Sequence, residues 1–272
     1  MIPNVLTIAG VDPSGGAGVL ADVKTFSALG AYSCGVIAAL TAQNTRAVTG
    51  IHEVPPAFLK LQLDTLFDDV RIDAVKVGML ASATLIRIVA EALGRYQPAF
   101  VVLDPVMVAK SGDRLLRAEA VDALRHELVP LASVLTPNLP EAGDLLGRAV
   151  TDSTDAMREA ARALYALGAR HVLVKGGHGA GDTLVDVLFD GARFVELPAP
   201  RIRTKNTHGT GCTLSSAIAA LAPQRPTIEA AVRDARAYVV AAIRRAGELR
   251  VGAGHGPLNH FHAIWPLQEA RP

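Results

Sequence analysis

Short apolar segments alternate along this chain with segments of helical spacing, and that alternation limits the possible folds more than any other feature. Glycine, proline or polar residues bound each apolar segment, as expected of buried strands. We expect such strands at 5–9, 32–40, 74–77, 100–103, 133–136 and 171–175. The helical segments lie at 18–29, 57–70, 82–96, 119–128 and 154–167. Because helices usually join parallel strands, this order predicts an α/β fold with a mostly parallel central sheet.

The alternation changes in the last third of the chain. Strands are expected at 184–189 and 193–197, and the Asp190-Gly191 pair between them is a strong hairpin signal. The sheet should therefore carry an antiparallel hairpin at its edge. Helices at 213–221 and 228–246 complete what we predict to be a single domain over residues 1–272.

Composition and charge narrow the functional classes. Half of the 272 residues are hydrophobic and 19% are charged, which is typical of a soluble globular protein. The net charge is +1, so no overall field recruits nucleic acid or an anionic membrane. No apolar run reaches the roughly 18 residues of a membrane span. With two cysteines and no signal-peptide pattern, a cytoplasmic location is expected.

The stretch 206–214 is the strongest candidate for a reaction centre. Gly209 and Gly211 bracket Thr210 and lead into an apolar helical pattern, so backbone N–H groups and the helix dipole should converge on an anion. Cys212 falls on the first helical turn, where a thiol pKa is expected to be lowered. The pattern predicts a phosphate site next to a proton acceptor. The alternative is a tight turn between a strand and a helix, and the spacing is not that of a Walker A loop.

Two further candidates lie near the N-terminus. The glycine-rich loop 10–18 follows the first strand and indicates a ligand-facing junction, although its glycines do not fit a dinucleotide fingerprint. Asp22, on the helix that follows, could face a small ligand or solvent. Gln43 follows the second strand, and its amide could bind the edge of a nitrogen heterocycle or cap a loop.

Polar residues also follow later strands. Asp104 leaves a buried strand end and could orient a metal-bound water or cap the next turn. Asn138 and Glu141 stand three apart at a helix start, a spacing that suits Mg²⁺ bound through water but equally suits a helix N-cap. Lys110 could close on a ligand or lie on the solvated surface.

The tail 254–262 contains His255, His260 and His262. These spacings raise the question of a transition metal, but no cysteine or carboxylate cluster joins the histidines within the tail. We expect the tail to pack back on the fold.

Seven ordered motifs together resemble the hydroxymethylpyrimidine and phosphomethylpyrimidine kinases of thiamine biosynthesis, members of the ribokinase-like superfamily. They lie at 8–18, 40–45, 77–80, 103–112, 135–142, 174–178 and 205–213, and the histidine-rich tail follows them. The resemblance implies a three-layer α/β/α sandwich that uses ATP and Mg²⁺. It also implies phosphorylation of 4-amino-5-hydroxymethyl-2-methylpyrimidine to its monophosphate and then its diphosphate, and a homodimer.

The resemblance further implies a role for each matching residue. Gln43 would bind the pyrimidine edge, within a pocket walled by Gly10, Asp12, Ala17, Asp22, Met79 and Val106. Asp104, Asn138 and Glu141 would lie near Mg²⁺ and the phosphates, and Lys110 would contact the transferring phosphate. The residues beside ATP would be Thr207, Lys175, Gly176, Gly177 and His178. Gly209, Thr210 and Gly211 would form the anion hole, with Cys212 as the base.

Three other functions compete with this one. Some relatives that share the Gly-Thr-Gly-Cys motif phosphorylate pyridoxal and carry a cysteine in the loop that closes on the substrate, where this chain has Ala109 before Lys110. A Cys–His hydrolase using Cys212 and His208 is disfavoured, because neighbours on one turn rarely reach the required geometry. A nucleotide-binding regulator without catalysis is the third alternative.

Overall fold

The computed structural model describes residues 1–108, 116, 119–177 and 181–265, and these residues form a nine-stranded sheet. The strand order is β3-β2-β1-β4-β5-β6-β7-β8-β9. Parallel pairing joins six of the strands. These strands are β1 (Asn4–Val11), β2 (Tyr32–Gln43), β4 (Ala74–Val77), β5 (Phe100–Leu103), β6 (Val134–Leu135) and β7 (Val172–Val174). The predicted parallel sheet is confirmed.

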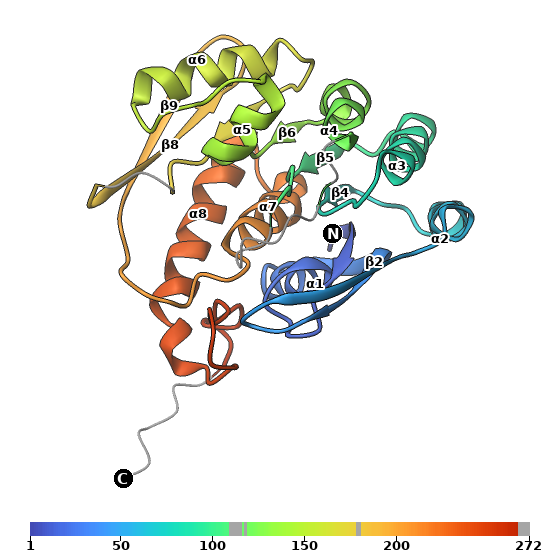
Figure 1. The fold of residues 1–272 in the computed structure, drawn as a ribbon, viewed down its shortest axis with the longest axis horizontal. Helices are drawn as coiled ribbons and strands as arrows, with labels where there is room; N and C mark the ends of the chain where they lie inside the picture. The colour runs from blue at the N-terminus through green and yellow to red at the C-terminus, as the bar shows by residue number, and fades with distance from the viewer. Residues whose placement is uncertain (109–115, 117–118, 178–180, 266–272) are drawn as a thin grey trace.

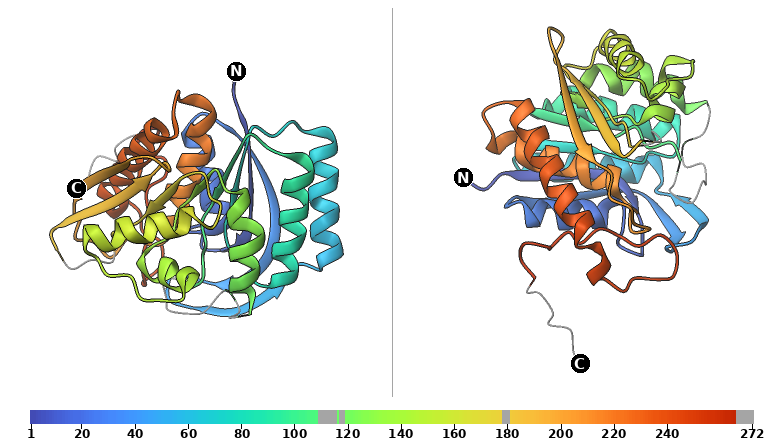
Figure 2. Two further views of the ribbon diagram at one scale, coloured as in Figure 1. Left: turned by 90° about the horizontal axis from the view of Figure 1, so that it is seen from above. Right: turned by 90° about the vertical axis from the view of Figure 1, so that its left-hand side faces the viewer.

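Helices cover both faces of the sheet, as the views in Figures 1 and 2 show. One face carries α2 (Pro56–Asp69), α3 (Ala83–Tyr96), α4 (Ala120–Ala123), α5 (Leu139–Leu146) and α6 (Thr154–Tyr165). The other face carries α1 (Gly18–Ala28), α7 (Thr210–Leu221) and α8 (Ile228–Arg244). A π-helical turn (Leu124–Leu128) and three 3₁₀ turns (Val129–Leu131, Ala222–Gln224, Ala246–Glu248) complete the helical segments described.

Alternation along the strands explains the two hydrophobic layers. On β5, Val101 and Leu103 enter the cluster with α2 to α6, whereas Val102 enters the cluster with α1, α7 and α8. Successive strand residues point to opposite faces, so a strand covered on both sides must be apolar throughout. This burial produces the apolar runs visible in the sequence.

Antiparallel strands lie at both ends of the sheet. The hairpin of β8 (Thr183–Phe189) and β9 (Phe194–Pro200) confirms the predicted edge hairpin. At the opposite end, β3 (Val48–Glu53) pairs antiparallel with β2, and the sequence analysis missed it. Most of the β3 side chains are exposed, so no apolar alternation marked this edge strand.

In the part of the chain that the structure describes, no helix combines the length and apolarity needed to cross a bilayer.

Candidate active site

The N-terminus of α7 has the geometry predicted for an anion site. Gly209 caps the helix with a φ of 77°, and a Cβ atom there would lie 1.8 Å from the carbonyl oxygen of Gly16. Only glycine satisfies both the left-handed backbone and this close approach. Just before it, the Thr207 carbonyl oxygen accepts hydrogen bonds from the amide and hydroxyl of Thr210. Cys212 lies on the first turn of α7, as expected.

The charge state of Cys212 differs from the expectation. Burial raises the pKa of this thiol to about 11, and the nearby carboxylates of Asp22 and Asp104 add to the rise. Lys76 and the backbone amide of Gly18, the first residue of α1, act in the opposite direction on the pKa. The helix N-terminus does not make Cys212 a ready thiolate at neutral pH, because the loss of water around the sulfur outweighs these favourable contacts.

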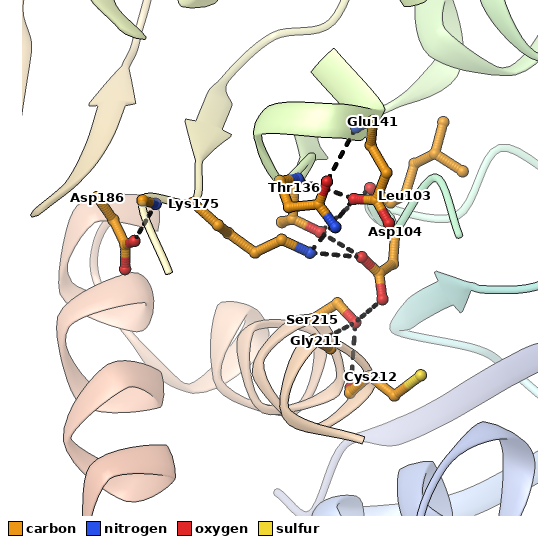
Figure 3. A network of polar contacts seen from close by, with 11 residues as sticks. Leu103, Asp104, Thr136, Glu141, Lys175, Asp186, Gly211, Cys212 and Ser215 are labelled. Carbon is orange, nitrogen blue, oxygen red and sulfur yellow. Dashed lines mark hydrogen bonds and ion pairs between the residues drawn. The ribbon is translucent and has the colours of Figure 1, made fainter. Parts of the chain in front are cut away.

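A polar network lies beside the first turn of α7, as Figure 3 shows. Asp104 follows β5 and Lys175 follows β7, and the Lys175 Nζ atom is 3.0 Å from Asp104 Oδ1. Ser215, on α7, donates a hydrogen bond to Asp104 Oδ2. A Cβ atom on Gly211 would lie 3.3 Å from Lys175 Nζ, so the ammonium adjoins the proposed anion hole. The carboxyl ends of these strands thus bring a cation to the helix N-terminus.

Lys175 keeps its charge in this enclosed position. Burial lowers the pKa of Lys175, but the carboxylates of Asp104 and Glu141 more than offset that effect, so its pKa is raised overall. Glu141 Oε2 is 3.7 Å from Lys175 Nζ. The lysine is therefore a fixed positive charge beside the start of α7.

Asn138 and Glu141 form a helix capping box. The Asn138 side chain accepts a hydrogen bond from the Glu141 amide, and the Glu141 side chain accepts one from the Asn138 amide. This is the alternative that the spacing left open. No group of three His, Cys, Asp or Glu side chains suited to a metal occurs among the described residues. The oxygens of Asp104 and Glu141 therefore fit Mg²⁺ only indirectly, through its waters and the nucleotide phosphates.

Glu141 gives the stability of the unliganded protein a pH dependence. Burial raises the pKa of Glu141 to about 7, Lys175 opposes the rise and Asp104 adds to it. Because the folded pKa exceeds the unfolded one, this contribution is full at acidic pH and is lost as pH rises through neutrality. From pH 5 to 7 we expect the free energy of unfolding of wild type to fall by about 1–2 kcal/mol relative to that of Glu141→Gln. Urea unfolding of both proteins measures this difference, and parallel pH profiles would show that Glu141 ionises normally.

Predicted acceptor-pocket residues gather at the carboxyl ends of β1, β4 and β5. Met79 packs with Ala39, Ala81 and Val106 in a small apolar cluster. A Cβ atom on Gly10 would lie 2.9 Å from the Met79 sulfur, so the glycine allows this packing. Gln43, at the end of β2, accepts a hydrogen bond from the Thr41 hydroxyl through its side-chain oxygen. Such an apolar wall suits a flat heterocycle.

Asp22 has buried polar partners, and its place in the wall of the acceptor pocket stays a prediction. Its side chain is fully buried and is bonded to the hydroxyls of Thr7 and Ser216, both at 2.6 Å, and to Lys76 Nζ at 2.8 Å. These partners come from β1, α7 and β4, so the carboxylate ties three elements to α1. The sequence analysis also missed Lys76. Its signal was a lysine inside the otherwise apolar 74–77, where a buried charge requires a partner.

Asp12 also has a structural role. It accepts hydrogen bonds from the amides of Ser14 and Ala17, and its Oδ2 atom is 2.7 Å from His208 Nε2. These contacts fix the glycine-rich loop against the residue before Gly209. Ala17 itself is the N-cap residue of α1 and is half-buried.

The turn after β7 contains two more of the predicted ATP residues, Gly176 and Gly177. The Gly176 amide donates to Asp186, and a Cβ atom on Gly176 would lie 2.0 Å from the Val185 carbonyl oxygen. Gly177 is exposed. Lys110 and His178 lie outside the described residues.

The three-layer sandwich, with a glycine-capped helix at the carboxyl ends of the strands, has the fold of ribokinase-like kinases. A Bacillus subtilis pyridoxal kinase solved as an ADP complex is 36% identical, with a TM-score of 0.89 over 97% of this chain and 99% of that one. A Clostridium difficile phosphomethylpyrimidine kinase is 40% identical, with a TM-score of 0.79 over 89% of this chain and 99% of that one.

The sequence comparisons identify the family. The phosphomethylpyrimidine kinase family model matches residues 12–259. A hydroxymethylpyrimidine/phosphomethylpyrimidine kinase of Escherichia coli (strain K12) is 53% identical over 96% of this chain and 98% of its own length. The enzyme of that name from Rhizobium meliloti (strain 1021) is 52% identical over 97% and 99%. The chain belongs to the phosphomethylpyrimidine kinase family.

Proposed function

We propose that this protein transfers a phosphoryl group from ATP to the hydroxymethyl oxygen of 4-amino-5-hydroxymethyl-2-methylpyrimidine, and then a second one to the resulting monophosphate. One observation carries the proposal: the glycine-capped start of α7, with Lys175 beside it, lies at the same edge of the sheet as the Gly10–Met79 wall. The names of the close relatives from Escherichia coli and Rhizobium meliloti support this acceptor.

Each group in the site has a defined part in the phosphoryl transfer. The acceptor oxygen forms a bond to the γ-phosphorus while the bond to the ADP oxygen breaks, and the electron pair leaves with ADP. Amides at Gly209, Thr210 and Gly211, together with Lys175, stabilise the charge on the migrating group. The hydroxyl proton passes to Cys212, which can accept it only as the thiolate. Mg²⁺ supplies further neutralisation of phosphate charge when bound, and Asp104 and Glu141 would hold it through water.

The thiolate is a minor species at neutral pH, since the pKa of Cys212 is about 11. Lys76 and the Gly18 amide favour the thiolate, so they increase the fraction of Cys212 that can accept the proton. A turnover that depends on this small fraction must rise with pH.

Several finer assignments stay predictions. Lys110 is proposed to contact the transferring phosphate, with a larger role in the second step because that acceptor is already a dianion. A homodimer and a cytoplasmic location are likewise inferred from the resemblance and the sequence.

An acceptor survey with Mg-ATP tests the proposed function. We expect kcat/KM for hydroxymethylpyrimidine and for its monophosphate to exceed that for pyridoxal. Pyridoxal is the informative rival, because the Bacillus subtilis pyridoxal kinase superposes over nearly the whole chain. A higher kcat/KM for pyridoxal would assign the protein to vitamin B6 salvage. ADP formation without any phosphorylated acceptor would overturn both assignments.

A further inference from the structure

The C-terminal segment 252–260, which we call the strap, lies next to the end of β2 (Figure 1). Its first contacts are with Thr45, two residues beyond Gln43. The Gly254 amide donates to Thr45 Oγ1 at 3.1 Å, and the His255 amide donates to the Thr45 carbonyl oxygen at 2.9 Å. A Cβ atom on Gly254 would lie 2.0 Å from that oxygen. The strap backbone is therefore hydrogen-bonded directly to the loop after β2.

The next residues of the strap contact the loop that leads into α7. The His208 amide donates to the Gly256 carbonyl oxygen at 3.0 Å, and His208 pairs with Pro257 in a parallel bridge. A Cβ atom on Gly256 would lie 2.3 Å from Asn206 Oδ1. His208 directly precedes Gly209, so this contact is one residue from the proposed anion hole.

The far end of the strap is anchored on α7 and α8. His260 Nε2 is 3.1 Å from the hydroxyl of Thr213, which follows Cys212, and both residues are buried. Burial lowers the pKa of His260 to about 4, with Lys24 and His262 acting in the same direction. The ring is therefore neutral at physiological pH and acts as a hydrogen-bond partner. Tyr238, on α8, donates its hydroxyl hydrogen to the His260 carbonyl oxygen at 2.7 Å.

We infer that the strap is a positioning segment that holds the pyrimidine-binding end of β2 at a fixed separation from the anion hole at the start of α7. The inference deepens the proposed function and rests on it. One short segment bonds to Thr45 on one side and to His208 and Thr213 on the other. Transfer between two substrates depends on their alignment, and a misplacement of about 1 Å can cost about 100-fold in rate. In this account the histidine-rich tail positions the end of β2 through hydrogen bonds, and no metal is needed for that role.

Gly254→Ala tests the strap, with Gly247→Ala as its matched control. The methyl group added at position 254 would collide with the Thr45 backbone, whereas a Cβ atom on Gly247 meets nothing within 4 Å. We expect the Gly254 variant to raise KM for hydroxymethylpyrimidine at least about 5-fold and to lower kcat about 10-fold. KM for ATP should stay within about twofold, because the contacts of Gly254 are with Thr45 and Arg46 and not with the start of α7. The control should match wild type in all three constants.

Thr45→Val provides a second variant that keeps the side-chain shape and removes the hydroxyl that accepts from Gly254. A smaller rise in the same KM is expected, with ATP again unaffected. The inference is overturned if both variants match the control, or if activity falls only in proportion to the folded fraction measured by circular dichroism. The activity of wild type on hydroxymethylpyrimidine tests the proposed function separately, because it does not depend on how the strap variants behave. If wild type prefers pyridoxal, the same comparison is made with pyridoxal as acceptor.

Discussion

Cys212→Ser is expected to lower kcat by about 100-fold or more while KM for the pyrimidine changes by less than about twofold. Serine has nearly the size of cysteine, so the acceptor should still bind. Its hydroxyl, however, ionises far less readily than a thiol and cannot take the acceptor proton. Steady-state kinetics with hydroxymethylpyrimidine measures both constants. Cys34→Ser is the matched control, because Cys34 is buried on β2 and has no part in the proposed chemistry.

The pH profile gives the same prediction a second readout. Since the pKa of Cys212 is about 11, its thiolate fraction grows about tenfold per pH unit below that value. Wild-type kcat should therefore rise between pH 7 and 10, and the Cys212→Ser profile should be flat over that range. A serine variant with wild-type kcat, or a wild-type profile as flat as that of the variant, would remove Cys212 from proton transfer.

Gly209→Ala is expected to lower kcat by about 100- to 1,000-fold, the usual cost of losing a donor that stabilises transition-state charge. The alanine would have to adopt a φ near 77° and would place its Cβ atom 1.8 Å from the Gly16 carbonyl oxygen. The start of α7 must then shift, and its backbone N–H groups no longer point at the same position. Initial rates at saturating pyrimidine and Mg-ATP measure the effect.

Gly147→Ala is the control for backbone strain alone. Gly147 ends α5 with a φ of 67°, and a Cβ atom there meets nothing within 4 Å. This variant should be modestly destabilised, on the order of 1 kcal/mol, with kcat unchanged. If Gly209→Ala kept the kcat of the Gly147 variant, the helix start would not be where phosphoryl charge is held.

The sequence was most informative where burial on both faces imposed a pattern. The apolar run of β5 was visible for that reason, whereas the turn between β8 and β9 was marked by Asp190-Gly191. The edge strand β3 was missed because its exposed side chains carry no such alternation. Gly209 marked the helix start, and its left-handed backbone conformation explains why glycine stands there.

The site departs from prediction where three-dimensional enclosure decides the chemistry. Nothing in the spacing of Asp22 and Lys76 reveals that they form a fully buried pair. The raised pKa of Cys212 likewise depends on how much water its neighbours exclude, which a position on a first helical turn does not disclose. For Asn138 and Glu141, a capping box and a metal site have the same spacing, and only coordinates distinguish them.

The most direct test of the central claim is an amide chemical-shift measurement with a mimic of the transferring phosphoryl group. ¹H–¹⁵N spectra would be recorded with Mg-ADP and hydroxymethylpyrimidine, before and after addition of aluminium fluoride. We predict that the largest shifts fall on the backbone amides of Gly209, Thr210, Gly211 and Cys212, with the Gly147 amide unchanged as a reference. Unmoved amides at 209–212, in a complex where the Gln43 side-chain amide responds to the pyrimidine, would contradict the account.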